Sequence, residues 1–220
     1  VLCMEATGVY GEKLAYYAVA NGYALAVEPP LKVKRAFKPV GHKNDSVDSK
    51  QIAEYSSRFY DKLRFWKPKS ELLEKIQVLL ATREQFVKHK TAHKNQKKAL
   101  ESKVVWSPLA ITLQEENIKR FEQQIDQIEK EIQKLIDDDP KYGQMVRLLK
   151  TIPGVKLLLA ANILLIMESL SWDKPDHKIM AAFIGICPYE KKSGTSVFRQ
   201  SSSRRQGPSR VRKLLYLSSL

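Results

Sequence analysis

The sequence predicts an α/β domain, a long helical arm and a mostly helical C-terminal domain, over residues 1–69, 70–140 and 141–220. Three observations lead to this division. Strand-like and helix-like segments alternate at the start, which is typical of a parallel sheet covered by helices. An apolar heptad pattern then runs through the middle of the chain, as in a coiled coil. A helix–turn–helix pattern with a basic segment after it fills the rest.

The first domain alternates short apolar runs with helical patterns. Residues 1–5 are an apolar run closed by an acid and a turn, so we expect a buried strand there. A helix over 10–21, a strand over 23–27 and helices over 31–37 and 48–59 follow from the same reasoning. Two strands make a poor sheet. We therefore expect further strands before the first residue and a domain that is incomplete at its start.

The arm contains two helical stretches separated by Ser107-Pro108. The second stretch repeats apolar residues in steps of 3, 4, 3, 4 and 3, which is the seam of a coiled coil. Its members are Ile118, Phe121, Ile125, Ile128, Ile132 and Leu135. Two helices around a break predict an antiparallel hairpin or a dimerising arm. The pattern leaves open whether the partner helix belongs to the same chain or to another.

The C-terminal domain has two features that suit contact with phosphate. Residues 151–155 form a Pro-Gly turn between two helical stretches, similar to a helix–hairpin–helix whose backbone N–H groups bind a phosphate. Lys156 stands where a second glycine is usual, and a plain helix–turn–helix in a core explains the pattern equally well. Residues 191–213 hold eight basic and no acidic residues before a helical pattern resumes, so we expect a folded basic site rather than a flexible tail.

The charge of the chain favours a polyanionic partner. The net charge is +14, and the segments 1–70, 71–107, 108–150 and 151–220 carry +5, +4, −2 and +7. Two basic blocks around an acidic helical spacer favour nucleic acid over a generally basic, solvated surface. Two cysteines exclude a disulfide scaffold and a four-cysteine zinc site. With no signal segment and no apolar run long enough to span a bilayer, we expect a soluble, cytoplasmic protein without a membrane partner.

Three carboxylates are candidates for binding Mg²⁺. Glu5 ends the first strand, where side chains of an α/β sheet often project into a site. Asp45 and Asp48 are three residues apart and share one helical face if the helix begins there. Converging carboxylates suit Mg²⁺, which takes oxygen ligands and leaves room for phosphate oxygens. The alternative is structural: Asp45 caps the helix and Asp48 is an acid in its first turn.

Ser193 lies in a small basic loop and is a candidate nucleophile. A serine hydroxyl needs a base, a metal or nearby cations to become reactive. Nearby lysines and arginines can stabilise a phosphorane-like transition state, although such a loop can also serve only to bind phosphate. The pair His89 and His93 lies among lysines, which disfavours a metal cation. No glycine-rich nucleotide loop is present in the sequence, which argues against a nucleotide-driven enzyme.

Five motifs in order resemble the insertion sequence 110 family of transposases. They are Met4-Glu5-Ala6-Thr7-Gly8, Pro29 with Lys34 and Phe37, Lys43-Asn44-Asp45-Ser46-Val47-Asp48, Ile152-Pro153-Gly154-Val155, and Gly185-Ile186-Cys187-Pro188 with Ser193-Gly194-Thr195-Ser196. The resemblance implies an RNase H-like (RuvC-like) α/β domain at the N-terminus, a coiled-coil arm and a C-terminal transposase domain with a helix–hairpin–helix-like element.

The resemblance also implies a composite catalytic site. Glu5, Asp45 and Asp48 match three members of a DEDD set that binds Mg²⁺, and the first aspartate of that set would precede residue 1. Ser193 matches the nucleophilic serine of the family, with Ser196 as the second choice. The family's site cuts and rejoins DNA through a phosphoserine link. Because the first aspartate is missing, we expect the chain as given to be weakly active or inactive.

The partners implied are DNA, a guide RNA from the same element, and further copies of the chain joined through the coiled coil as a dimer or tetramer. The candidate nucleic-acid contacts are basic residues of the arm and the C-terminal domain: Lys88, Lys90, Lys94, Lys97, Lys98, Lys156, Lys191, Lys192, Arg199, Arg204, Arg205, Arg210 and Arg212. Two other hypotheses stay open. One is a non-catalytic nucleic-acid-binding coiled-coil protein, and the other is an RNase H-like, metal-dependent nuclease.

Overall fold

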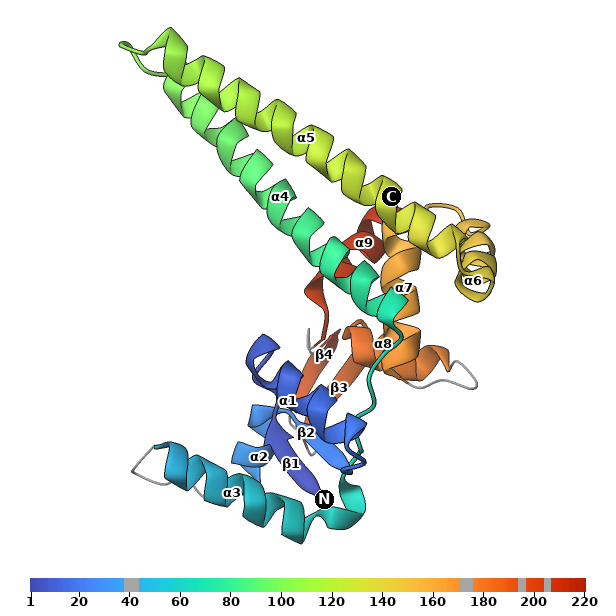
Figure 1. The fold of residues 1–220 in the computed structure, drawn as a ribbon. Coiled ribbons are helices and arrows are strands. Elements are labelled where there is room, and N and C mark those ends of the chain that lie inside the picture. The colour runs from blue at the N-terminus through green and yellow to red at the C-terminus, as the bar shows by residue number, and fades with distance from the viewer. Residues whose placement is uncertain (38–43, 171–175, 194–196, 204–206) are drawn as a thin grey trace. The chain divides into compact units, whose positions relative to one another are not determined.

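A computed structural model describes residues 1–37, 44–170, 176–193, 197–203 and 207–220 (Figure 1). The chain forms two compact units, Val1–Lys69 and Ser70–Leu220. The second unit contains both the arm and the C-terminal helices. Within the described ranges, no helix combines the length and the apolar character that crossing a membrane requires.

The first unit alternates strands and helices around a small parallel sheet. Its elements are β1 (Leu2–Glu5), α1 (Val9–Ala20), β2 (Leu25–Glu28), α2 (Pro30–Arg35), α3 (Asp45–Arg58) and a 3-10 turn, η1 (Tyr60–Lys62). β1 and β2 pair in parallel, from Leu2 opposite Leu25 to Glu5 opposite Glu28. The parallel sheet that the sequence predicts is therefore confirmed for these two strands.

Two helices, α1 and α3, contact the sheet of the first unit. Met4, Leu25 and Val27 pack with Ala15 and Ala18 of α1 into one small core. α3 contacts β1, and α2 contacts α3. Because side chains alternate between the faces of a strand, Glu5 and Glu28 belong to the face opposite this core.

The expectation that β1 is buried is wrong. Leu2 is 43% exposed, and the rest of the strand is only half-buried. β2, by contrast, is buried at three of its four positions. The physical reason is that the chain around Phe65 and Trp66 covers the far side of β2, with Phe65 bridging Ala26, whereas β1 pairs only with β2 within the described part of the chain.

The arm is an antiparallel hairpin of α4 (Glu71–Glu101) and α5 (Pro108–Asp137) (Figure 1). The Ser70 hydroxyl accepts the N–H of Leu73 and caps α4, and Pro108 occupies the first turn of α5, where its missing N–H costs nothing. The predicted seam packs inside the chain: Ile132 is fully buried in a core that includes Ile76 of α4. The helix that covers at least this part of the seam therefore belongs to the same chain.

The rest of the second unit is built around α7. Its elements are α6 (Pro140–Lys150), α7 (Leu157–Ser169), α8 (His177–Ile184), β3 (Pro188–Ser193), β4 (Val197–Ser203) and α9 (Ser209–Ser218). α7 is apolar on all sides because it contributes to two cores, one with α4, α5 and α6 and one with α8 and α9. Its buried Asn162 is satisfied by donating to the carbonyl of Leu158 at 2.6 Å.

The predicted helix–turn–helix is present as α6, the turn and α7. Gly154 in this turn has φ of +81°, which favours glycine, and a Cβ there would strike the carbonyl of Ser218 at the end of α9. The turn is thus held close to α9 as well as joining two helices.

A β-hairpin follows α8, which the sequence analysis did not predict. β3 and β4 pair antiparallel, from Pro188 opposite Ser203 to Ser193 opposite Val197. The expected basic loop is therefore part of a two-stranded sheet over its described residues, and the C-terminal domain is not purely helical.

Candidate active site

Glu5, Asp45 and Asp48 line one open groove of the first unit, with a volume of about 610 Å³. The groove is formed by β1, the start of α1 and one face of α3. Glu5 reaches it from the carboxyl end of β1, and the aspartates reach it from the first turn of α3. Residues far apart in the sequence are thus brought to the same surface, as the sequence analysis required for a carboxylate site.

The start of α3 explains how the two aspartates are presented. Asn44 is the N-cap, and its side-chain oxygen accepts the N–H of Val47 at 2.9 Å. The structural alternative that makes Asp45 the cap is therefore wrong, because Asp45 is already the first helical residue. Asp45 is exposed and Asp48 is half-buried. Neither carboxylate forms an ion pair with another residue of the described ranges.

The donor set fits a hard divalent cation in its chemistry. All three groove carboxylates offer oxygen, which Mg²⁺ prefers, and the groove is open to a phosphate. The three do not close into a ligand cluster: within the described ranges, no three acidic, histidine or cysteine side chains lie close enough to hold a metal ion.

Ser193 lies in the second unit, at the last position of β3. Its backbone pairs with that of Val197 in β4. Residues 194–196, including the second-choice Ser196, lie outside the described residues. The structure therefore places Ser193 at the end of a strand pair in which Lys191, Lys192 and Arg199 are also strand residues.

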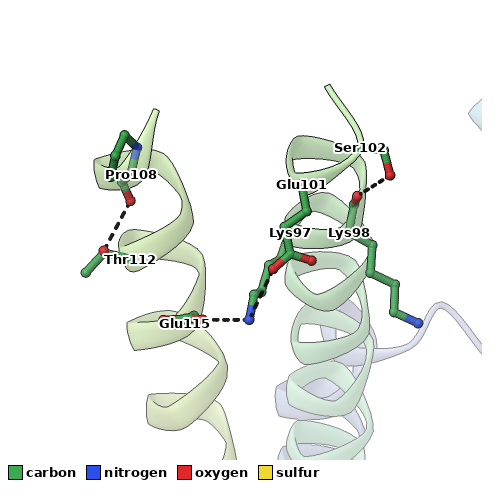
Figure 2. Close-up of polar contacts among 7 residues, drawn as sticks. All are labelled: Lys97, Lys98, Glu101, Ser102, Pro108, Thr112 and Glu115. Atoms are coloured by element: carbon green, nitrogen blue, oxygen red, sulfur yellow. Dashed lines mark hydrogen bonds and ion pairs between the residues drawn. The ribbon is translucent and has the colours of Figure 1, made fainter. Parts of the chain in front are cut away.

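The basic residues of the arm divide into two kinds. Lys90 and Lys94 face α5, with their ammonium groups 3.6 Å and 3.4 Å from a carboxylate oxygen of Glu122. Lys97 lies 2.6 Å from Glu115 of α5 and also pairs with Glu101 on its own helix (Figure 2).

Figure 2 shows the neighbouring Lys98 pointing away from α5. Lys88 pairs along α4 with Glu84 at 3.8 Å. The contacts across the hairpin therefore occupy Lys90, Lys94 and Lys97, while Lys98 faces solvent.

Two arginines of α9, Arg210 and Arg212, are engaged inside the second unit. Arg210 of α9 donates to the carbonyl of Leu80 at 2.6 Å and lies 3.6 Å from Glu84 of α4. Burial lowers the pKa of Arg210, and Glu84 opposes that shift. Arg212 donates to the carbonyl of Ile184 at 2.8 Å.

The other basic candidates have different positions. Lys156 is exposed at the start of α7, which suits a contact with phosphate. Arg204 and Arg205 lie outside the described residues.

Both ends of the chain match transposase families. Residues 1–104 match a transposase model of the DEDD type, and residues 146–220 match the model described as Transposase IS116/IS110/IS902 family. The chain belongs to this family of transposases. Two curated relatives, the pilin gene-inverting proteins of Moraxella lacunata and Moraxella bovis, are each 29% identical over 219 residues, or 98% of this chain. The chain spans 65% of the length of these relatives.

The matched regions contain the three groove carboxylates and Ser193. The first match covers the groove of Glu5, Asp45 and Asp48 and continues through α4. The second begins within α6 and includes the hairpin that carries Ser193. All of α5 lies between the two matches, although it supplies the seam that packs against α4.

The sequence analysis missed one acidic residue near the groove. Glu28 ends β2, directly opposite Glu5 in the strand register. It is only 3% exposed, and its carboxylate lies 2.7 Å from the ammonium of Lys32. The signal was available, because Glu28 closes an apolar run just as Glu5 does and has a lysine four residues later.

Proposed function

We propose that this chain is the recombinase of an insertion sequence, which cuts and rejoins DNA. The observation that carries the proposal is the shared groove of Glu5, Asp45 and Asp48, in a chain that belongs to a transposase family. The name of the Moraxella relatives describes gene inversion, a reaction in which DNA is both cut and rejoined. This supports recombination over simple hydrolysis.

Glu5, Asp45 and Asp48 would hold a divalent cation, which we take to be Mg²⁺, within an RNase H-like domain. The bound ion would stabilise negative charge on the oxygens of the scissile phosphate. The chain's own contribution is to present the ligands: β1 delivers Glu5, and the Asn44 cap keeps the first turn of α3 formed under the two aspartates. The aspartates are free of competing ion pairs among the described residues, which favours their use as ligands.

Ser193 is the proposed nucleophile. Its hydroxyl oxygen would form a bond to the phosphorus of the scissile phosphate and lose its proton to water. The bond from phosphorus to one deoxyribose oxygen would break, leaving a free DNA hydroxyl and a phosphoserine link. Attack by a second DNA hydroxyl on that phosphorus would reverse the step and release the serine, so the DNA is rejoined without external energy.

The proposed partners are DNA, a guide RNA and further copies of this chain. The net charge of +14 and the exposed Lys98 and Lys156 support binding to a nucleic-acid backbone. A dimer or tetramer would have to use surface outside the buried part of the seam, because α4 already covers that part. The tip of the arm has exposed apolar side chains that such an interface could bury, namely Val104, Val105 and Trp106.

A test for a covalent intermediate separates the alternatives. The protein, in a form that spans the full length of its Moraxella relatives, is incubated with its element's transcript, Mg²⁺ and DNA carrying the element junction, and then denatured. A protein–DNA adduct that is lost in Ser193→Ala but kept in Ser218→Ala supports the proposal. Nicking that survives Ser193→Ala supports a metal-dependent nuclease. Binding without any cleavage, unchanged by Asp45→Asn with Asp48→Asn, supports a non-catalytic binding protein.

A further inference from the structure

Two glutamates end the two parallel strands of the first unit, and the structure treats them differently. Glu5 and Glu28 lie opposite each other in the register. Glu5 lines the groove, whereas Glu28 does not line it and is buried. The carboxylate of Glu28 is held 2.7 Å from the ammonium of Lys32 on α2. Because a buried carboxylate is stable as an ion only when it is paired, this contact must persist for the sheet edge to keep its form.

The Glu28–Lys32 pair also reaches α3, the helix that carries the two groove aspartates. The ammonium of Lys32 lies 5.8 Å from the ring centroid of Tyr55, which is 3% exposed. Its hydrogen bond to Glu28 raises the pKa of Lys32; burial opposes this shift, and a weaker hydrogen bond with Tyr55 adds to it. Tyr55 follows Asp48 by two turns of α3 and therefore lies on the same side of the helix.

We propose that Glu28, Lys32 and Tyr55 are positioning residues that fix α3 against the carboxyl edge of the sheet. They form a continuous chain of contacts from β2 through α2 to α3. Through this chain, Asp45 and Asp48 are held on the groove that Glu5 enters. The importance of that placement for catalysis rests on the proposed function, whereas the placement itself is a property of the fold.

Hydrogen exchange measured by mass spectrometry on the whole 220-residue chain tests the placement without any metal. Glu28→Gln keeps the shape but removes the negative charge, so the Lys32 ammonium faces a neutral amide oxygen. We expect local opening of α3 to increase by about tenfold, while α1 exchanges as before. Tyr55→Phe should move α3 in the same direction by less. Val33→Ala, which removes two buried methyl groups from α2 and keeps all three residues, is the matched control.

The inference is overturned if α3 exchanges in Glu28→Gln as it does in the wild type, or if α1 is loosened equally. It is also overturned if Val33→Ala loosens α3 selectively to the same extent, since generic weakening of α2 would then explain the effect.

Binding of Mn²⁺, followed by its electron paramagnetic resonance, gives the second readout. Glu28→Gln should weaken binding by about tenfold, as loss of an orienting residue behind metal ligands does. Wild-type protein that binds no Mn²⁺ would count against the metal part of the proposed function, while the exchange data would still decide the inference.

Discussion

The N-cap of α3 offers a sharp test of the groove, through the substitution Asn44→Ala. The Asn44 side chain accepts the N–H of Val47 at 2.9 Å at an exposed position. Removing such a cap costs about 1 kcal/mol, which corresponds to about a fivefold increase in fraying of the first turn. Asp45 and Asp48 both lie in that turn. If their fixed positions matter for binding a cation, affinity for Mn²⁺ should fall by a similar factor.

The assay compares Mn²⁺ affinity and thermal unfolding in three variants. Asn44→Ser restores a capping oxygen and should recover most of the lost affinity. Asn21→Ala is the matched control, because it removes an exposed asparagine hydrogen bond, 2.8 Å to the carbonyl of Tyr17, from α1. It should lower stability without changing affinity. The reasoning fails if Asn44→Ala binds Mn²⁺ as the wild type does, or if Asn21→Ala weakens binding equally.

Three further predictions concern the second unit. Gly154→Ala should lower the melting temperature and loosen the packing of α9 in hydrogen exchange, because a Cβ at this left-handed position would strike a carbonyl of α9. Ile132→Ala should reduce the free energy of unfolding by about 2–5 kcal/mol in denaturant titrations, whereas Ile152→Ala, at a half-exposed site, should change it by less than about 1 kcal/mol. Lys98→Gln should reduce the salt dependence of DNA binding by about one counterion, while Lys97→Gln, whose ammonium already pairs across the hairpin, should change it less.

The elements that could be predicted are those whose side chains repeat along one face. The seam around Ile125 and Ile132 has the period of a helix that buries one side, and α5 forms where that period runs. The parallel strands were predictable because apolar runs alternate with helical patterns. The choice of α4 as partner was not, because the period of one helix does not specify which surface will cover it.

The β-hairpin of β3 and β4 illustrates a different limit. Its strands read Tyr-Glu-Lys-Lys and Arg-Gln-Ser-Ser over much of their length, without the apolar alternation of a half-buried strand. The two strands pair through backbone hydrogen bonds, which every residue type except proline can form, so the pairing does not require a particular side-chain pattern. A basic, serine-rich strand and a basic, serine-rich loop therefore look alike in the sequence.

The candidate site shows what counting charges leaves out. The lysines of α4 were singled out as phosphate contacts from their density alone. Folding brings Glu115 and Glu122 of α5 opposite three of them, so part of that positive charge is used inside the hairpin. In the same way, Arg210 is a link between α9 and α4 in the structure. Its role as a contact to nucleic acid stays a prediction.

The choice between the two strand-end glutamates has a physical basis that does not depend on family resemblance. In the sequence, Glu5 and Glu28 are equivalent, since each ends an apolar run. In the structure, β2 is the covered strand, so Glu28 is buried and its carboxylate is held by Lys32. β1 is less covered, so Glu5 stays half-buried and reaches the groove that also receives Asp45 and Asp48. Because β2 is buried more deeply than β1, Glu5 stays available as a ligand, whereas Glu28 is paired with Lys32 and stabilises the fold.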